Sequence, residues 1–115
     1  MKTSYFAKYK GENAISISLS TPSWFKGTAY KKLAPSWNLL NGYKNGDISK
    51  EQYINIYITT VLNKLDAREV YDDLGKDAVL MCWEKSSDFC HRHIVATWFL
   101  DKLGIEVEEY IKEIK

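Results

Sequence analysis

A continuous apolar run at residues 77–82, Asp77-Ala-Val-Leu-Met-Cys82, is the feature that most constrains the fold of this chain. A strand with one solvent-exposed face alternates apolar and polar residues, whereas a run without alternation is typical of a strand buried on both faces of a parallel sheet. Parallel strands need long crossover connections, which are usually helices. The run therefore predicts an α/β fold with residues 77–82 in the centre of its sheet.

Other segments predict the neighbours of this central strand. Aromatic residues are concentrated at 3–9, and apolar residues alternate with small polar ones at 14–19, so both segments are predicted strands. A last strand is predicted at 105–109, and the segment 23–35 is predicted to be an irregular loop with one short helical turn. The chain thus supplies strands both before and after the central one.

Helices are predicted between these strands. Ser49 and Gln52 form a capping box, and apolar residues at helical spacing then run to about Leu65. The alternation of helices and strands predicts a single Rossmann-like α/β domain over residues 1–115, with a small layered sheet that is at least partly parallel and helices packed on its faces. The other helices are expected at 36–40, 66–74 and 91–103.

The composition is that of an ordinary globular domain. Hydrophobic residues make up 45% and charged residues 27% of the 115 residues, so disorder is not indicated. No stretch approaches the roughly 20 apolar residues of a membrane span, and Lys8 and Lys10 interrupt the only candidate for a signal-peptide core. A cytoplasmic protein without a membrane partner is therefore expected, with Cys82 and Cys90 as reduced thiols.

The segment from Cys82 to His93 concentrates the chemically unusual residues. Both cysteines, both histidines and one of only two arginines lie in these twelve residues. The segment runs from the end of the predicted buried strand through a polar loop to the start of a helix. Ligands of open α/β sheets bind at this carboxyl edge of the strands, so the segment is the main candidate site.

The start of that helix favours an anion. Unpaired N–H groups and the positive end of the helix dipole attract negative charge and lower the pKa of a thiol placed there, as Cys90 is. Arg92 can offer a planar fork of donors to a phosphate, and Lys85 can add a positive charge. Glu84 and His91 are candidates for general acid or base. We therefore predict catalytic roles for Glu84, Cys90, His91 and Arg92, and ligand-binding roles for Cys82 and Lys85.

Several of these residues also have a structural interpretation. Cys82 can simply pack in the core. His91 can be a buried histidine with satisfied hydrogen bonds, whereas His93 is expected on the solvent side. Arg92 can pair with Glu84 or Asp88 and tie the loop to the helix. In that case the residues stabilise the segment without any direct part in function.

Two familiar sites do not fit the segment. Zinc would have four potential ligands in Cys82, Cys90, His91 and His93, but their C-x7-C-H-x-H spacing matches none of the usual pairings, and strand and helix positions are not expected to converge. A phosphatase loop of cysteine, five residues and arginine is absent, because Asp88 stands where the arginine is required. No metal and no cofactor are therefore predicted.

A second cluster lies in the basic half of the chain. Residues 1–50 carry eight lysines and two acidic residues, net +6, whereas residues 51–115 carry eight basic and thirteen acidic residues, net −5. In the loop 21–35, three aromatic residues are interspersed with three lysines. Nucleic-acid-binding sites have this composition, because aromatic rings stack on bases and lysines bind phosphates. The alternative is a covering loop with buried aromatics and solvated lysines. The candidate ligand-binding residues of this loop are Lys26, Gly27 and Tyr30.

Six short motifs, spread over nearly the whole chain, carry a family resemblance. They are Ser18-Leu-Ser-Thr-Pro22, Phe25-Lys-Gly27, Tyr30-Lys-Lys-Leu-Ala-Pro35, Val61-Leu-Asn-Lys-Leu65, Leu80-Met-Cys-Trp-Glu-Lys85 and Asp88-Phe-Cys-His-Arg92. In these motifs the chain resembles the family known as domain of unknown function 488 (DUF488), whose short members occur in bacteria and their phages. The resemblance implies no particular reaction. It marks Cys82, Glu84, Lys85, Cys90, His91 and Arg92, with Lys26, Gly27, Tyr30 and Pro35 in the second cluster.

Three functional hypotheses follow. The first is a small enzyme or ligand-binding domain that holds an anionic, phosphate-bearing or nucleotide-like ligand between the two clusters, with Lys26, Lys85 and Arg92 on the anion. The second is a non-catalytic module that binds nucleic acid or protein through the basic aromatic half. In the third, the cysteine, histidine and arginine side chains only fix the loop.

Overall fold

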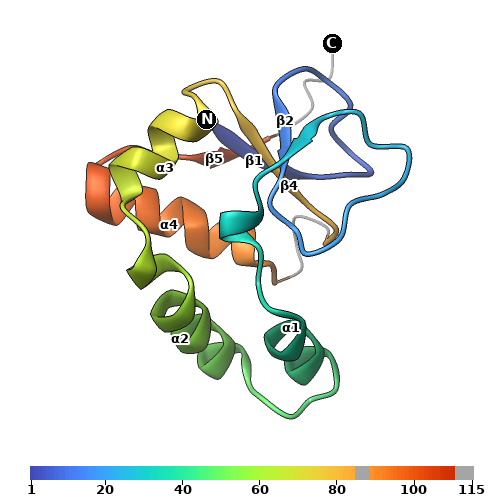
Figure 1. Cartoon of the computed structure of the whole chain (residues 1–115), viewed down its shortest axis with the longest axis vertical. Helices are drawn as coiled ribbons and strands as arrows, with labels where there is room; N and C mark the ends of the chain where they lie inside the picture. Colours follow the sequence, from blue (N-terminus) through green and yellow to red (C-terminus); the bar gives the residue numbers. More distant parts are fainter. Residues whose placement is uncertain (85–88, 111–115) are drawn as a thin grey trace.

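Five parallel strands form one sheet in the computed structural model of the chain, which describes residues 1–84 and 89–110 (Figure 1). Strand β4 lies in the middle of the order β3-β2-β4-β1-β5, and all four of its residues are buried. The predicted α/β fold is therefore confirmed, with the apolar run in its centre. The strands are β1 (Lys2–Tyr5), β2 (Ala14–Ser16), β3 (Thr28–Ala29), β4 (Val79–Cys82) and β5 (Glu108–Glu109).

Four α-helices accompany the sheet. Ser36, Ser49 and Asp66 cap the first three, because each side chain accepts a hydrogen bond from the first helical turn. Cys90 precedes the fourth helix, and its side chain provides no such cap. None of the helices in the described part of the chain has both the length and the apolar character needed to cross a membrane. The helices are α1 (Trp37–Lys44), α2 (Lys50–Thr60), α3 (Ala67–Leu74) and α4 (His91–Leu103), with 3-10 turns η1 (Lys31–Leu33) and η2 (Leu62–Lys64).

Several element boundaries differ from the sequence-based prediction. The predicted strand 3–9 ends at Tyr5, and the loop predicted at 23–35 contains the short strand β3. Helix α2 ends at Thr60, and the turn that follows it is a 3-10 helix. Helix α1 continues through Gly42, where a stop was predicted, because a single helical glycine costs only about 1 kcal/mol. This extension brings Lys44 into the helix.

The two faces of the sheet are covered differently. Leu80 belongs to a large core cluster that includes residues from all four helices. Val79 and Met81 belong to a smaller cluster, in which Phe6 and Phe25 from loops cover the other face. Residues on β4 therefore alternate between a helical layer and a loop layer, and both faces of the strand exclude water.

The parallel arrangement gives the sheet two distinct edges. The carboxyl ends of the strands meet at one edge, where Cys82 ends β4 and Cys90 precedes α4. The amino ends meet at the opposite edge, which receives the segments that lead into β3 and β4. Any ligand site between loops must therefore belong to one edge or the other.

Candidate functional site

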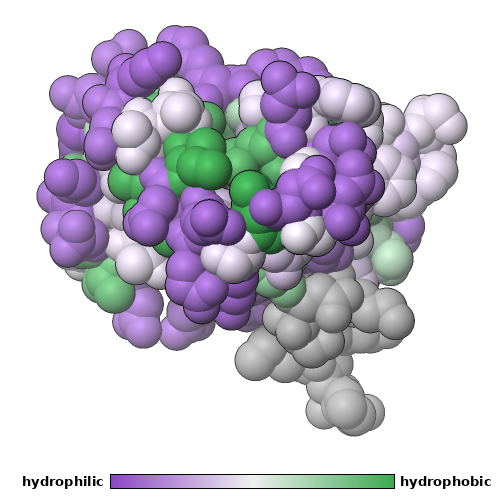
Figure 2. Space-filling model, turned by 90° about the horizontal axis from the view of Figure 1, so that it is seen from below, coloured by the Kyte–Doolittle hydropathy of each residue, from purple (hydrophilic) through white to green (hydrophobic). Residues whose placement is uncertain are grey.

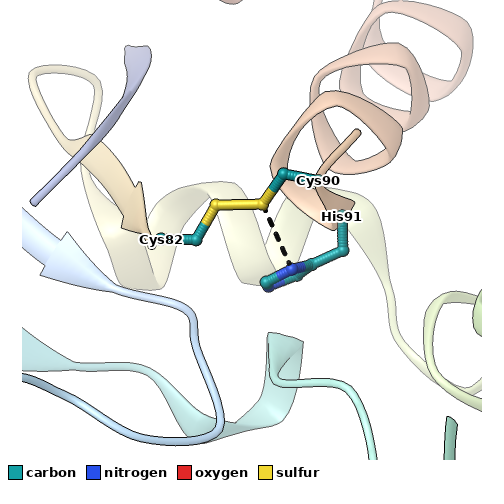
Figure 3. A group of neighbouring side chains, drawn as sticks. All are labelled: Cys82, Cys90 and His91. Carbon is teal, nitrogen blue, oxygen red and sulfur yellow. Dashed lines mark hydrogen bonds between the residues drawn. A yellow bond between two sulfur atoms is a disulfide. The ribbon is translucent and has the colours of Figure 1, made fainter. Parts of the chain in front are cut away.

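Cys82 and Cys90 are joined by a disulfide at the carboxyl edge (Figure 3). The chain leaves β4 at Cys82 and returns to the start of α4 at Cys90, so the two sulfur atoms meet although eight positions separate them in sequence. The prediction that both cysteines are reduced thiols is therefore wrong for this structure. Both side chains are buried, and reduction would leave two thiols close together.

His91 lies against this pair of sulfur atoms (Figure 3). Its Nε2 is 2.7 Å from the backbone oxygen of Ile17, which can only accept a hydrogen bond, so Nε2 carries the hydrogen. Burial lowers the pKa of His91 to about 4, and the imidazole is neutral at pH 7. Nδ1 therefore keeps its lone pair, 3.6 Å from Sγ of Cys90.

Arg92 is fully buried beside the same cluster. Its Nε and Nη2 donate to the two carboxylate oxygens of Glu109, at 3.1 and 3.0 Å. Its Nη1 donates to Sγ of Cys82 and to the backbone oxygen of Glu84, both at 2.8 Å. Arg92 thus ties α4 to β5, to the end of β4 and to the loop that follows. These contacts agree with a structural role of Arg92 in tying the loop to the helix. The carboxylate that it binds is that of Glu109, however, and not that of Glu84. Asp88, the other predicted partner, lies outside the described residues.

Two adjoining cavities open at the carboxyl edge, with volumes of about 330 and 290 Å³. Both are lined by Leu40, Lys44, Glu84 and His91. The larger one is also lined by Cys90. We call the two together the carboxyl-edge cavity. This cavity brings together three of the predicted site residues, namely Glu84, Cys90 and His91. Lys85 lies outside the described residues.

The second predicted cluster lies elsewhere. Lys26 and Gly27 precede β3 and line a cavity of about 930 Å³ with Lys76 and Asp77, which lead into β4. At Gly27 a Cβ atom would lie 2.3 Å from a backbone oxygen, so the glycine permits a close approach of two chain segments. The hydroxyl of Tyr30 donates a hydrogen bond to Asp73, and burial raises the pKa of Tyr30. The structure therefore does not join Lys26, Gly27 and Tyr30 to the Cys82–Arg92 segment in one cleft.

A comparison of sequences agrees with the resemblance noted above. A profile of the DUF488-N3a family, described as the active DUF488-N3 subclade, matches residues 13–103. The chain belongs to the DUF488 family. The match includes the cysteines, His91 and Arg92, and it also includes both ends of β4. No curated protein and no solved structure matches the chain.

Sequence reasoning missed several residues that line the cavity in this DUF488 chain, among them Lys44 and Tyr53. Lys44 is exposed and lines both parts of the cavity, and Tyr53 lines the larger part. Burial and the nearby carboxylate of Glu84 raise the pKa of Tyr53, so its hydroxyl stays protonated and can donate a hydrogen bond. The sequence did contain an indication of Lys44. Lys44 stands four residues after Leu40, so the two share a helix face if the helix continues that far. The predicted end of the helix at 41–42 excluded this arrangement.

The second histidine of the DUF488 chain faces another part of the molecule. His93 lines an apolar groove of about 670 Å³ between α2 and α4, with Ile54 and Ile58. Seen from below, hydrophobic side chains gather near the middle of the face within a ring of hydrophilic ones (Figure 2). Burial lowers the pKa of His93, and its Nε2 has no hydrogen-bond partner among the described residues. His91 and His93 therefore lie in different surroundings, although only one residue separates them in the sequence.

Proposed function

We propose that this DUF488 chain binds an anionic, phosphate-bearing or nucleotide-like ligand in the carboxyl-edge cavity and processes it there. The observation that carries the proposal is that Lys44, Glu84 and His91 line both parts of this cavity. A cation can hold an anion, while a carboxylate and a neutral imidazole can exchange protons with it. Each part of the cavity, at about 330 and 290 Å³, is near the lower end of the roughly 300–1,000 Å³ of small-molecule sites.

Anion binding rests on two groups with positive charge character. The ammonium group of Lys44 is exposed to solvent and can approach a ligand in either part of the cavity. The N-terminus of α4 is the second group, since the side chain of Cys90 does not cap the N–H groups of the first turn. Glu84 shares the cavity, so the anionic part of the ligand would lie towards Lys44 and α4.

Processing rests on the groups beside the anion. In the reduced protein Cys90, His91 and Glu84 supply a sulfur atom, an imidazole lone pair and a carboxylate around the larger part of the cavity. Arg92 acts as a positioning residue, because it holds both Cys82 and the backbone at Glu84. The description of the matched subclade as active supports a catalytic role.

Replacing Lys44 with glutamine is expected to weaken binding of inorganic pyrophosphate or AMP at least tenfold. A hydrogen bond to a charged group contributes about 1.5–3 kcal/mol, and about 1.4 kcal/mol corresponds to a factor of ten. Isothermal titration calorimetry on the reduced protein measures the change. Lys26→Gln, at the amino edge, is the matched control and should bind like the wild type. Weaker binding in Lys26→Gln with unchanged binding in Lys44→Gln would contradict the proposal.

A second candidate function is the binding of single-stranded nucleic acid. Trp24 and Trp83 are about half exposed, at 52% and 50%, and the ring of Phe6 contacts both edge-on. Lys10 places its ammonium group 3.7 Å from the centre of the Trp24 ring. Trp83 also lines the smaller part of the carboxyl-edge cavity. Exposed aromatic faces beside lysines favour base stacking.

Replacing Trp83 with alanine is expected to weaken binding of a fluorescent oligothymidylate about fivefold or more, because a stacked base contributes about 1–3 kcal/mol. Fluorescence anisotropy at low salt gives the affinity, and binding should fall steeply as salt is added. Trp37, which is 64% exposed at the start of α1, provides the control Trp37→Ala. Equal losses in both variants, or no binding at low salt, would remove this second function.

A further inference from the structure

We infer that Cys82, Cys90 and His91 bind a zinc ion when the two cysteines are reduced. The potential ligand atoms of these three residues all lie within 4.8 Å of one another, and all three side chains are buried. The spacing in the sequence argued against zinc because strand and helix positions were not expected to converge. The turn from β4 into α4 makes them converge, and only His93 of the four potential ligands faces elsewhere.

The distances suit a tetrahedral ion. With Zn–S bonds of about 2.3 Å and Zn–N bonds of about 2.0–2.1 Å, a sulfur and a nitrogen ligand lie about 3.6 Å apart. Sγ of Cys90 and Nδ1 of His91 are 3.6 Å apart. Two sulfur ligands of the same ion lie about 3.8 Å apart. The Cα atoms of Cys82 and Cys90 are 7.5 Å apart, beyond the usual 4.4–6.8 Å or so of a disulfide, and this spacing leaves room for two separate thiolates.

The surroundings prepare each ligand for a metal. His91 donates from Nε2 to the backbone oxygen of Ile17, which fixes the ring and leaves Nδ1 free to bind. A backbone carbonyl is one of the usual outer contacts of a metal-binding histidine. Arg92 donates to Sγ of Cys82 and favours its thiolate form. Two thiolates balance the charge of Zn²⁺, and Glu109 balances that of Arg92.

The ligand count indicates a reactive rather than a purely structural ion. Structural zinc sites have four protein ligands, whereas catalytic sites have three and leave one position for water or substrate. Cys90 and His91 line the larger part of the cavity together with Glu84, so the remaining position can be filled from there. A zinc-bound water beside a carboxylate is a common hydrolytic arrangement, in which the carboxylate moves the proton. The inference goes beyond the proposed function, since the ion can bind without any anionic ligand.

Cobalt(II) is the probe that tests this site, because it substitutes for zinc and is coloured. The whole chain is reduced with a phosphine, freed of metal by a chelator and titrated with Co²⁺ in a buffer without phosphate. We expect one Co²⁺ per chain, with a thiolate-to-cobalt charge-transfer band in the near ultraviolet and the visible bands of a four-coordinate ion. Addition of Zn²⁺ should remove these bands at a ratio of one to one.

Variants separate the three ligands from their neighbours. His91→Gln and Cys90→Ser should bind Co²⁺ roughly a hundredfold more weakly or not at all, because loss of an outer-shell partner alone costs about 10–100-fold, while circular dichroism confirms that they are folded. His93→Gln and Lys44→Gln are the matched controls and should keep the full spectrum. The disulfide form should bind no Co²⁺, because both sulfur atoms are already bonded to each other.

Two results would overturn the zinc site. One is a reduced, folded wild-type chain that takes up no metal at a ratio of one to one. The other is a His91→Gln variant that keeps the wild-type affinity and spectrum. Neither depends on an anion, so a normal cobalt spectrum without pyrophosphate binding would remove only the proposed function. Pyrophosphate binding without a cobalt spectrum would remove only the zinc site.

Discussion

Replacing Arg92 with glutamine is expected to lower the free energy of unfolding by about 3–5 kcal/mol. Arg92 is fully buried, and the side chain of Glu109 is only 21% exposed. Loss of the guanidinium removes two charge-assisted hydrogen bonds to this carboxylate, and it removes the donor to Cys82 and to the Glu84 backbone. Urea denaturation of the disulfide form at pH 7 measures the effect.

Arg68 provides the matched control, because its ion pair with Asp72 is exposed. The two side chains are 66% and 59% accessible, and the pair spans 3.4 Å on one face of α3. Such pairs contribute about 0–1 kcal/mol, so Arg68→Gln should change stability little. The double variant Arg92→Gln, Glu109→Gln should recover part of the loss, since the partly buried carboxylate is then replaced by a neutral amide. Equal effects of the Arg92 and Arg68 substitutions would show that Arg92 does not fix the site.

Acidification is expected to destabilise the disulfide form by about 3 kcal/mol through His91 alone. The pKa of His91 is about 4 in the folded chain because of burial, against 6.5 for an ordinary histidine. Between these two values the unfolded chain binds a proton that the folded chain does not bind. Stability is therefore full above pH 6.5 and falls as the pH is lowered towards 4, which urea denaturation at stepped pH values measures.

The substitution His91→Gln isolates this effect. Glutamine can still donate to the backbone oxygen of Ile17 but does not titrate, so the variant should lose less stability between pH 7 and pH 4 than the wild type. Carboxylates contribute to acid unfolding in both proteins and cancel in the comparison. His93→Gln, the control, should keep most of the wild-type loss. A His91→Gln variant with the full wild-type loss would contradict the assignment of a buried, neutral His91.

Local patterns predicted the centre of the fold. The apolar run predicted β4, and the apolar positions between His91 and Leu103 predicted α4 with its observed bounds. The helix ends before Gly104, which adopts the left-handed conformation with φ 66°. The residues around the disulfide were found for the same reason, because Cys82, Cys90 and His91 belong to one strand-to-helix connection.

Contacts between distant segments were not predicted. Glu109 meets Arg92 only because β5 lies beside β1 at the edge of the sheet, and Lys44 reaches the site only because α1 packs on α2. Lys26 and Gly27 were assigned to the same cleft as Cys90 because the two-residue strand β3 gave no signal in the sequence. Since β3 runs parallel to β2, the chain must return to the amino edge before β3 begins, and it carries Lys26 and Gly27 there.

The sequence-based expectation of no metal and the inferred zinc site differ for a related reason. Known zinc spacings describe short loops and helices that place their own ligands. In this chain Cys82 comes from a strand end and Cys90 and His91 come from a helix start, so the approach of their ligand atoms depends on the fold. Spacing alone could not show it.

An NMR titration of the reduced, ¹⁵N-labelled chain with pyrophosphate tests most directly whether the ligand site lies at the carboxyl edge. The account predicts the largest amide shifts at Lys44, His91 and Arg92, around the cavity and the start of α4. The amides of Lys26 and Gly27, at the amino edge, should stay in place. Shifts centred on Lys26 and Gly27, with none at His91 and Arg92, would contradict it.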